Sequence, residues 1–164
     1  MVYKKPWDFR CSRRSGFILA EALLVVFIVS IAMAMTWPHL WDWHQERELD
    51  MAVEEVVAAI RQTETNARSY TTKYGNITSK VAFYCGPGSD GRVTYYAKRG
   101  IYRMGPKGTL PQNIKAQSVL DLTFRKDGYA GESKRYSQTL QTKDGRHYRT
   151  IIVAVYTGRV HIEK

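Results

Sequence analysis

An almost continuous apolar segment, Phe17 to Trp37, constrains this chain more than any other feature of its sequence. Its 21 residues contain one ionisable side chain, Glu21. As an α-helix it would measure roughly 31 Å at about 1.5 Å per residue, close to the roughly 30 Å hydrocarbon core of a bilayer. Five basic residues and one acidic residue precede it, so the positive-inside rule predicts a cytoplasmic N-terminus. Trp37, Trp41 and Trp43 cluster at the expected membrane exit.

Three other interpretations of the segment explain less of it. A secretory signal peptide would have a shorter apolar core before its cleavage site; Ala32-Met33-Ala34 fits that site loosely, but the apolar run continues beyond it. A lipoprotein anchor needs a cysteine after the run, whereas Cys11 precedes it. A plain membrane anchor explains length and orientation. It leaves Glu21 without a partner, although a carboxylate inside a bilayer costs on the order of 2.5 to 3.5 kcal/mol.

The residues around Glu21 resemble the class III signal of type IV prepilins and pseudopilins. The similarity rests on Ser15-Gly16-Phe17-Ile18-Leu19-Ala20-Glu21, which follows a basic leader and opens the apolar run; Ala20 departs from the commoner pattern. The resemblance implies cleavage by prepilin peptidase between Gly16 and Phe17 and methylation of the new amino group of Phe17. It also implies that Glu21 pairs with this amine in a neighbouring subunit during assembly. Pro38 falls where many pilin helices carry a helix-bending proline.

The pattern after Pro38 predicts the outer half of the same long helix, followed by a sheet domain. An apolar stripe with helical period continues to about Ser69. From about Ser79, short β-rich runs alternate with turn signals, and Asp-Gly pairs favour hairpins. We expect an α+β fold in which the long helix packs on one antiparallel sheet or two small ones. The expected parts are a leader (1–16), a transmembrane helix (17–37), an amphipathic half (38–70) and a sheet domain (71–164), with strands near 81–84, 92–97, 101–104, 119–125, 136–141 and 148–156.

The C-terminal part, Phe124 to Lys164, is similar to the domain shared by GspH of type II secretion, the FimT minor pilins and, more distantly, the competence pseudopilin ComGD. Phe124 with Gly128, and Thr157-Gly158-Arg159-Val160, carry this likeness. It implies a minor pilin or pseudopilin of a type IV pilus or competence system, with other pilins, prepilin peptidase and the membrane-embedded assembly platform as partners. A GspH-like role in type II secretion is an alternative. A membrane-anchored extracytoplasmic binding domain that never polymerises is the hypothesis of a different class.

Charge is divided unevenly along the chain, whose formal net charge is +10. Residues 17–90 hold 5 basic and 9 acidic side chains, whereas residues 91–164 hold 15 basic and 5 acidic ones. Cations alternate with aromatic residues in this second part, a pattern typical of surfaces that contact DNA. The candidate DNA contacts are Arg146, Arg149 and Arg159; a solvated basic face is the alternative. FimT-type minor pilins used in DNA uptake end in Gly-Arg-x-Arg, and here His161 replaces the second arginine.

The sequence contains no motif typical of an enzyme, a cofactor site or a metal site. The four histidines are dispersed, and Asp90, Asp127 and Asp144 each precede a glycine, where turn chemistry accounts for them. We therefore expect no catalytic activity, no cofactor and no bound metal. Cleavage after Gly16 would leave Cys85 as the single cysteine, which excludes an intrachain disulfide. The expected role of Cys85 is that of a small buried apolar residue.

Overall fold

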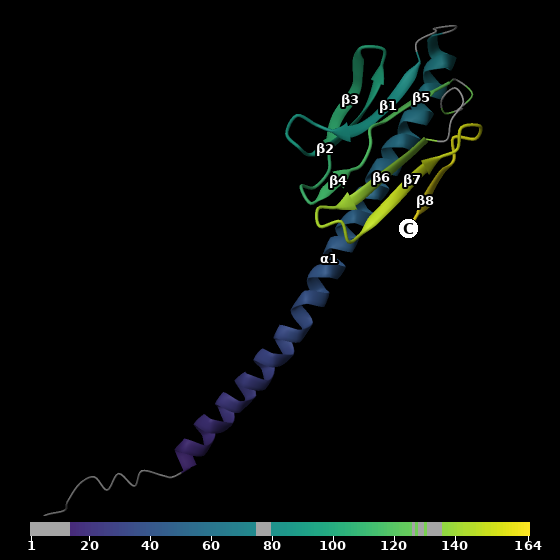
Figure 1. Ribbon diagram of the computed structural model, residues 1–164. Coiled ribbons are helices and arrows are strands. Elements are labelled where there is room, and N and C mark those ends of the chain that lie inside the picture. The colour runs from purple at the N-terminus through teal and green to yellow at the C-terminus, as the bar shows by residue number, and fades with distance from the viewer. Residues whose placement is uncertain (1–13, 75–79, 126, 128–129, 131–135) are drawn as a thin grey trace, which may run out of the picture. The chain divides into compact units, whose positions relative to one another are not determined.

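The computed structural model describes residues 14–74, 80–125, 127, 130 and 136–164, and of residues 14–16 and 70–74 it describes the backbone alone (Figure 1). The chain divides into two compact units, one ending at Asp42 and one from Trp43 to Lys164. Each unit is described by itself below. The helix α1 (Arg14–Tyr74) contributes to both, and the strands are β1 (Val81–Pro87), β2 (Val93–Arg99), β3 (Tyr102–Thr109), β4 (Ile114–Ala116), β5 (Leu120–Phe124), β6 (Tyr136–Thr142), β7 (Tyr148–Val153) and β8 (Val160–Glu163).

The first unit consists, in its described part, of the apolar stretch of α1. An 18-residue window there has a mean hydropathy of 2.7 and is entirely exposed, and α1 is the one described helix that is long and apolar enough to cross a membrane. The hydroxyls of Ser30 and Thr36 donate to the carbonyls of Val26 and Ala32 at 2.7 and 2.9 Å, so their polar groups are satisfied within the helix. Pro38 lies inside α1 and does not end it.

The second unit begins with the outer stretch of α1, which buries one side against two sheets (Figure 1). Every residue of the predicted apolar stripe is buried, with at most 4% of its surface exposed. The predicted α+β fold, a long N-terminal helix packed on antiparallel β-structure, is therefore confirmed. Its helix extends to Tyr74, beyond the predicted end near Ser69. The buried stripe residues are Leu49, Val53, Val56, Ile60 and Ala67.

The strands form two four-stranded antiparallel sheets. The first has the order β3-β2-β1-β5 and the second the order β4-β6-β7-β8. Six of the strands overlap the predicted ranges; β4 and β8 were not predicted as separate strands, because three and four residues are too short to give a clear alternation. In β5 and β6, buried residues alternate with more exposed ones, as expected of sheets with one face on a core.

The core of the second unit lies between α1 and the inner faces of both sheets. Phe83 and Leu122 of the first sheet and Leu140 and Ile151 of the second are fully buried and belong to the same cluster as the helix stripe. Cys85 is also fully buried there, as predicted. Burial raises the pKa of its thiol to about 12, so the thiolate is strongly disfavoured and the cysteine acts as a packing residue.

Candidate functional site

The candidate cleavage site lies at the beginning of α1. Gly16 belongs to α1, where its backbone alone is described, and the leader before Arg14 lies outside the described residues. The Phe17 side chain is 81% exposed, and Glu21 is exposed one helical turn further on. Glu21 makes no hydrogen bond or ion pair with any residue that the structure describes. The first unit therefore presents one carboxylate in a stretch of α1 whose surrounding side chains are apolar.

Arg149 does not lie on an open basic surface, contrary to its prediction as a candidate DNA contact. Its side chain is only 6% exposed, and its guanidinium donates to Glu46 Oε1 at 2.7 Å and to Asp50 Oδ1 at 2.9 Å. These carboxylates lie one turn apart on α1, so a single β7 side chain joins two successive helical turns. Arg149 is therefore a structural connection between sheet and helix, and a phosphate could reach it only by displacing two carboxylates.

The charges of this cluster reinforce one another. The hydrogen bond from Arg149 lowers the pKa of Glu46 below its usual value of 4.5, although partial desolvation opposes this shift. Burial alone would lower the pKa of Arg149, but the hydrogen bonds and charges of Glu46 and Asp50 outweigh it and raise that pKa. Both shifts favour the ionised forms of Glu46 and Arg149 at neutral pH, which keeps the connection between them intact.

Arg146 and Arg159, the other two candidate DNA contacts, are exposed but lie far apart. Arg146 follows β6 in the turn that leads into β7, whereas Arg159 precedes β8 at the other end of β7 (Figure 1). The six residues of β7 span about 20 Å, at about 3.3 Å per residue. The three predicted arginines therefore do not form one patch.

The β6–β7 turn is built by local hydrogen bonds. Asp144 accepts from the Thr142 hydroxyl at 2.5 Å and from the Arg146 amide at 3.3 Å, and Gly145 adopts a positive φ of 74°. The Thr142 hydroxyl is the main cause of the lowered pKa of Asp144. This geometry agrees with the interpretation that turn chemistry accounts for Asp144.

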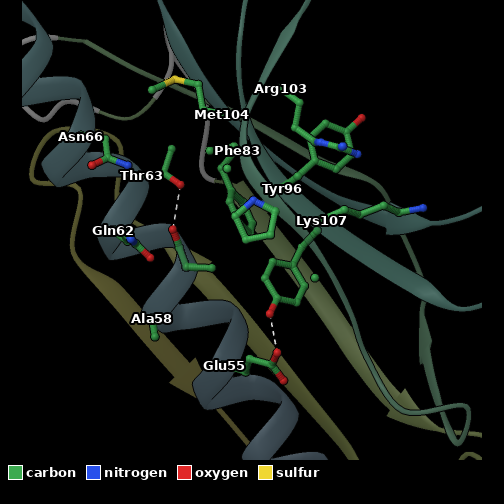
Figure 2. Close-up of a pocket in the computed structure, with 16 residues that line it drawn as sticks. Glu55, Ala58, Gln62, Thr63, Asn66, Phe83, Tyr96, Arg103, Met104 and Lys107 are labelled. Atoms are coloured by element: carbon green, nitrogen blue, oxygen red, sulfur yellow. Dashed lines mark hydrogen bonds between the residues drawn. The ribbon is translucent and has the colours of Figure 1, made fainter.

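A groove of about 700 Å³, which the sequence did not suggest, runs between α1 and the β2–β3 hairpin (Figure 2). Glu55, Gln62 and Asn66 line it from the helix, and Tyr96, Arg103, Met104 and Lys107 from the strands. The Tyr95 hydroxyl donates to Glu55 across one end, as the dashed line in Figure 2 marks. Burial, followed by this hydrogen bond, raises the pKa of Tyr95, so the phenol stays protonated.

The groove exists because β3 departs from regular pairing. Between the pairs Ala97–Met104 and Tyr95–Gly108, the single residue Tyr96 of β2 opposes three residues of β3, Gly105 to Lys107. A Cβ atom at Gly108 would lie 2.0 Å from the Tyr95 ring, so only glycine lets that ring lie against β3. Such a bulge depends on cross-strand register, which single-sequence periodicity does not reveal; the only local signal was Gly105-Pro106 within the run.

No group of three or more histidine, cysteine, aspartate or glutamate side chains that could hold a metal ion occurs among the residues that the structure describes. The folded chain is thus an α+β protein with an apolar N-terminal helix stretch and a compact unit of two antiparallel sheets. Comparisons with protein-family models, with curated protein sequences and with solved structures gave no significant match to it.

Proposed function

We propose that this protein is a minor pilin or pseudopilin, a structural subunit that is incorporated through α1 into a type IV pilus or a competence pseudopilus. The observation that carries the proposal is the exposed carboxylate of Glu21 in an apolar stretch whose 18-residue window is entirely unburied. In this proposal, the stretch crosses the bacterial cytoplasmic membrane with the N-terminus inside. The second unit lies outside the cytoplasm.

The physical argument concerns the partner of Glu21. Cleavage between Gly16 and Phe17 would create an α-amino cation four residues before this carboxylate, at the head of the helix. Either charge alone is costly in hydrocarbon, whereas the amine of one subunit and the carboxylate of the next can neutralise each other. Such a pair fixes the axial position of neighbouring helices, and the exposed apolar side chains around it supply packing area. Prepilin peptidase and an assembly platform in the membrane are the partners that this process requires.

The decisive experiment combines mass spectrometry with one substitution. Protein recovered from cells should begin at a methylated Phe17, and an intact chain beginning at Met1 as the only species would overturn the proposal. Glu21→Ala should abolish incorporation into filaments while membrane insertion is retained, because an apolar helix inserts more readily without the carboxylate. Ser30→Ala is the matched control, since the Ser30 hydroxyl bonds within its own helix and its loss should leave incorporation unchanged.

A second candidate function is a membrane-anchored binding domain that never polymerises. The second unit supports this candidate because it has a complete core of its own, made by α1 and both sheets. The same substitution separates the two, since an anchored domain should behave identically with Glu21→Ala. A GspH-like role in type II secretion shares the assembly step with the pilus role. It is distinguished by whether deletion of the gene impairs protein secretion or DNA uptake.

Contact with DNA is the finer part of the proposal. The 15 basic and 5 acidic side chains of residues 91–164 favour a polyanionic partner. Because Arg149 is engaged by Glu46 and Asp50, it contributes to the fold rather than to such a contact. Arg146 and Arg159 remain exposed candidates at separate places on the second sheet.

A further inference from the structure

Among the hairpins that the structure describes in the second unit, the β2–β3 hairpin of the first sheet has the least balanced charge. Residues 98–107, Lys-Arg-Gly-Ile-Tyr-Arg-Met-Gly-Pro-Lys, hold four cations and no anion. Lys98 is paired with Asp121 at 2.6 Å, on the face that carries the stacked rings of Tyr84 and Tyr96. Arg103 and Lys107 are exposed and Arg99 is half-exposed. Arg103 and Lys107, with Ile101 and Tyr102, are named here the hairpin patch.

The tip of this hairpin exposes large side chains that the fold does not need. Ile101 is 91% exposed and Tyr102 is 75% exposed. Gly100 takes the positive φ, 61°, that the two-residue turn requires, so the turn itself is explained by glycine alone. Polar residues are the usual occupants of such positions. An exposed aromatic ring at a tight turn, next to Arg103 in the chain, is therefore available for contact with a partner.

The groove beside α1 continues this surface. Arg103 and Lys107 belong both to the hairpin patch and to the groove lining, and Figure 2 shows them on the strand side of the groove, with side chains that extend away from α1 and from the amide groups of Gln62 and Asn66. A volume of about 700 Å³ is within the range of roughly 300 to 1,000 Å³ typical of small-molecule sites, so an unstacked nucleotide base fits it by size. Amide groups in such a site can hydrogen-bond base edges.

We infer that single-stranded DNA binds along the β2–β3 hairpin, with phosphates on Arg103 and Lys107. One base stacks on Tyr102, and a neighbouring base enters the groove between α1 and the bulged part of β3. An unpaired strand is favoured over a duplex because only an unstacked base can cover an exposed tyrosine ring or enter a groove. Among the described residues that line the groove, Glu55 is the one acidic side chain, and the Tyr95 hydroxyl donates a hydrogen bond to it at one end of the groove. This inference rests on the proposed contact with DNA and gives that contact a location.

The test uses the full chain in detergent and a fluorescently labelled 20-nucleotide single strand, followed by anisotropy at several salt concentrations. Arg103→Gln with Lys107→Gln should weaken binding at least tenfold and reduce the steepness of its salt dependence by about 1.4, as expected for the loss of two phosphate contacts on a single strand. The matched control, Lys115→Gln with Lys143→Gln, removes the same charge from exposed positions of the second sheet and should weaken binding by no more than about twofold.

A second variant tests stacking separately from charge. Tyr102→Leu keeps the exposed apolar surface but removes the ring, and it should weaken single-strand binding about fivefold or more while duplex binding stays unchanged. Equal losses in both double variants would overturn the location, as would an unchanged affinity of Tyr102→Leu. Wild-type protein that fails to bind the strand at 100 mM salt would overturn both this inference and the DNA part of the proposed function. The filament experiment on Glu21 is independent of these outcomes.

Discussion

Two stretches of α1 have similar lengths but opposite surroundings. Residues 17–41 are exposed at every position, including large side chains such as Phe27, at 63%, and Ile28, at 56%. Residues 43–69 expose mainly polar side chains and bury an apolar stripe beneath two sheets. The same backbone conformation therefore serves one stretch that is apolar all around and another that is apolar on one side.

The difference teaches what each stretch needs from its environment. A helix that is apolar on one side can bury that side by packing within its own unit, as residues 43–69 do. A helix that is apolar on all sides needs a lipid phase or neighbouring helices around it. Burial contributes roughly 25 cal/mol per Å² of apolar surface, so the first stretch has a large unused driving force for insertion or assembly. We propose that this driving force contributes to assembly through α1.

The largest effect is expected from one of two matched substitutions, one in each stretch of α1, which test this comparison directly. Ile60→Ala should destabilise the second unit by about 2 to 5 kcal/mol, because Ile60 is fully buried and its truncation leaves a cavity between α1 and the sheets. Ile28→Ala, the matched change in the first stretch, should leave the unfolding of the second unit unchanged. Urea titration of the full chain in detergent, followed by near-ultraviolet circular dichroism, measures both.

An equal loss in the two variants would contradict the division into two environments. It would mean that the stability of the second unit depends on the apolar stretch, although its core residues all lie in the second unit. We expect the wild-type protein to unfold in a single transition. In Ile28→Ala, the free energy of unfolding should depend on urea concentration as it does in the wild type.

Sequence patterns predicted the parts of this molecule that depend on local periodicity. The apolar segment, the buried stripe from Leu49 to Ala67 and most strands follow from spacing within a few residues. The position of Arg149 did not, because its partners Glu46 and Asp50 are 103 and 99 residues away along the chain. An arginine in an alternating strand looks the same whether it faces water or two carboxylates. The groove could not be predicted from the sequence either, because it depends on how β2 and β3 pair around Tyr96.

A smaller effect is expected where Arg149 ties the second stretch of α1 to the second sheet. Arg149→Met keeps much of the side-chain volume but removes both hydrogen bonds to carboxylates, and it should destabilise the second unit by about 1 to 2 kcal/mol. The size is limited because Glu46 and Asp50 are 41% and 47% exposed and regain water. Arg146→Met, at an exposed position in the adjacent turn, should change stability by less than about 0.5 kcal/mol.

The result would also test where the boundary between the two stretches lies. Hydrogen exchange should become faster in Arg149→Met around Glu46 and Asp50, the first two turns of the second stretch, and remain slow around Ile60, which is held by the core. Faster exchange at all three positions would mean that the arginine supports the whole helix rather than its beginning.

The smallest expected effect is a pH dependence at the same connection. The pKa of Glu46 is lowered in the folded state, so its contribution to stability is complete above pH 4.5, the usual value, and is lost as the pH falls below 4.5 through the folded-state pKa. Glu46→Gln should therefore flatten the fall in the urea midpoint below pH 4.5. In an Arg149→Met background the same substitution should change this slope much less, because the hydrogen bond that is the main cause of the lowered pKa is already absent. Asp144→Asn should flatten the slope in both backgrounds, since the Thr142 hydroxyl, and not Arg149, is the main cause of the lowered pKa of Asp144. A Glu46→Gln effect of the same size with and without Arg149 would mean that the acid sensitivity does not come from the connection between α1 and β7.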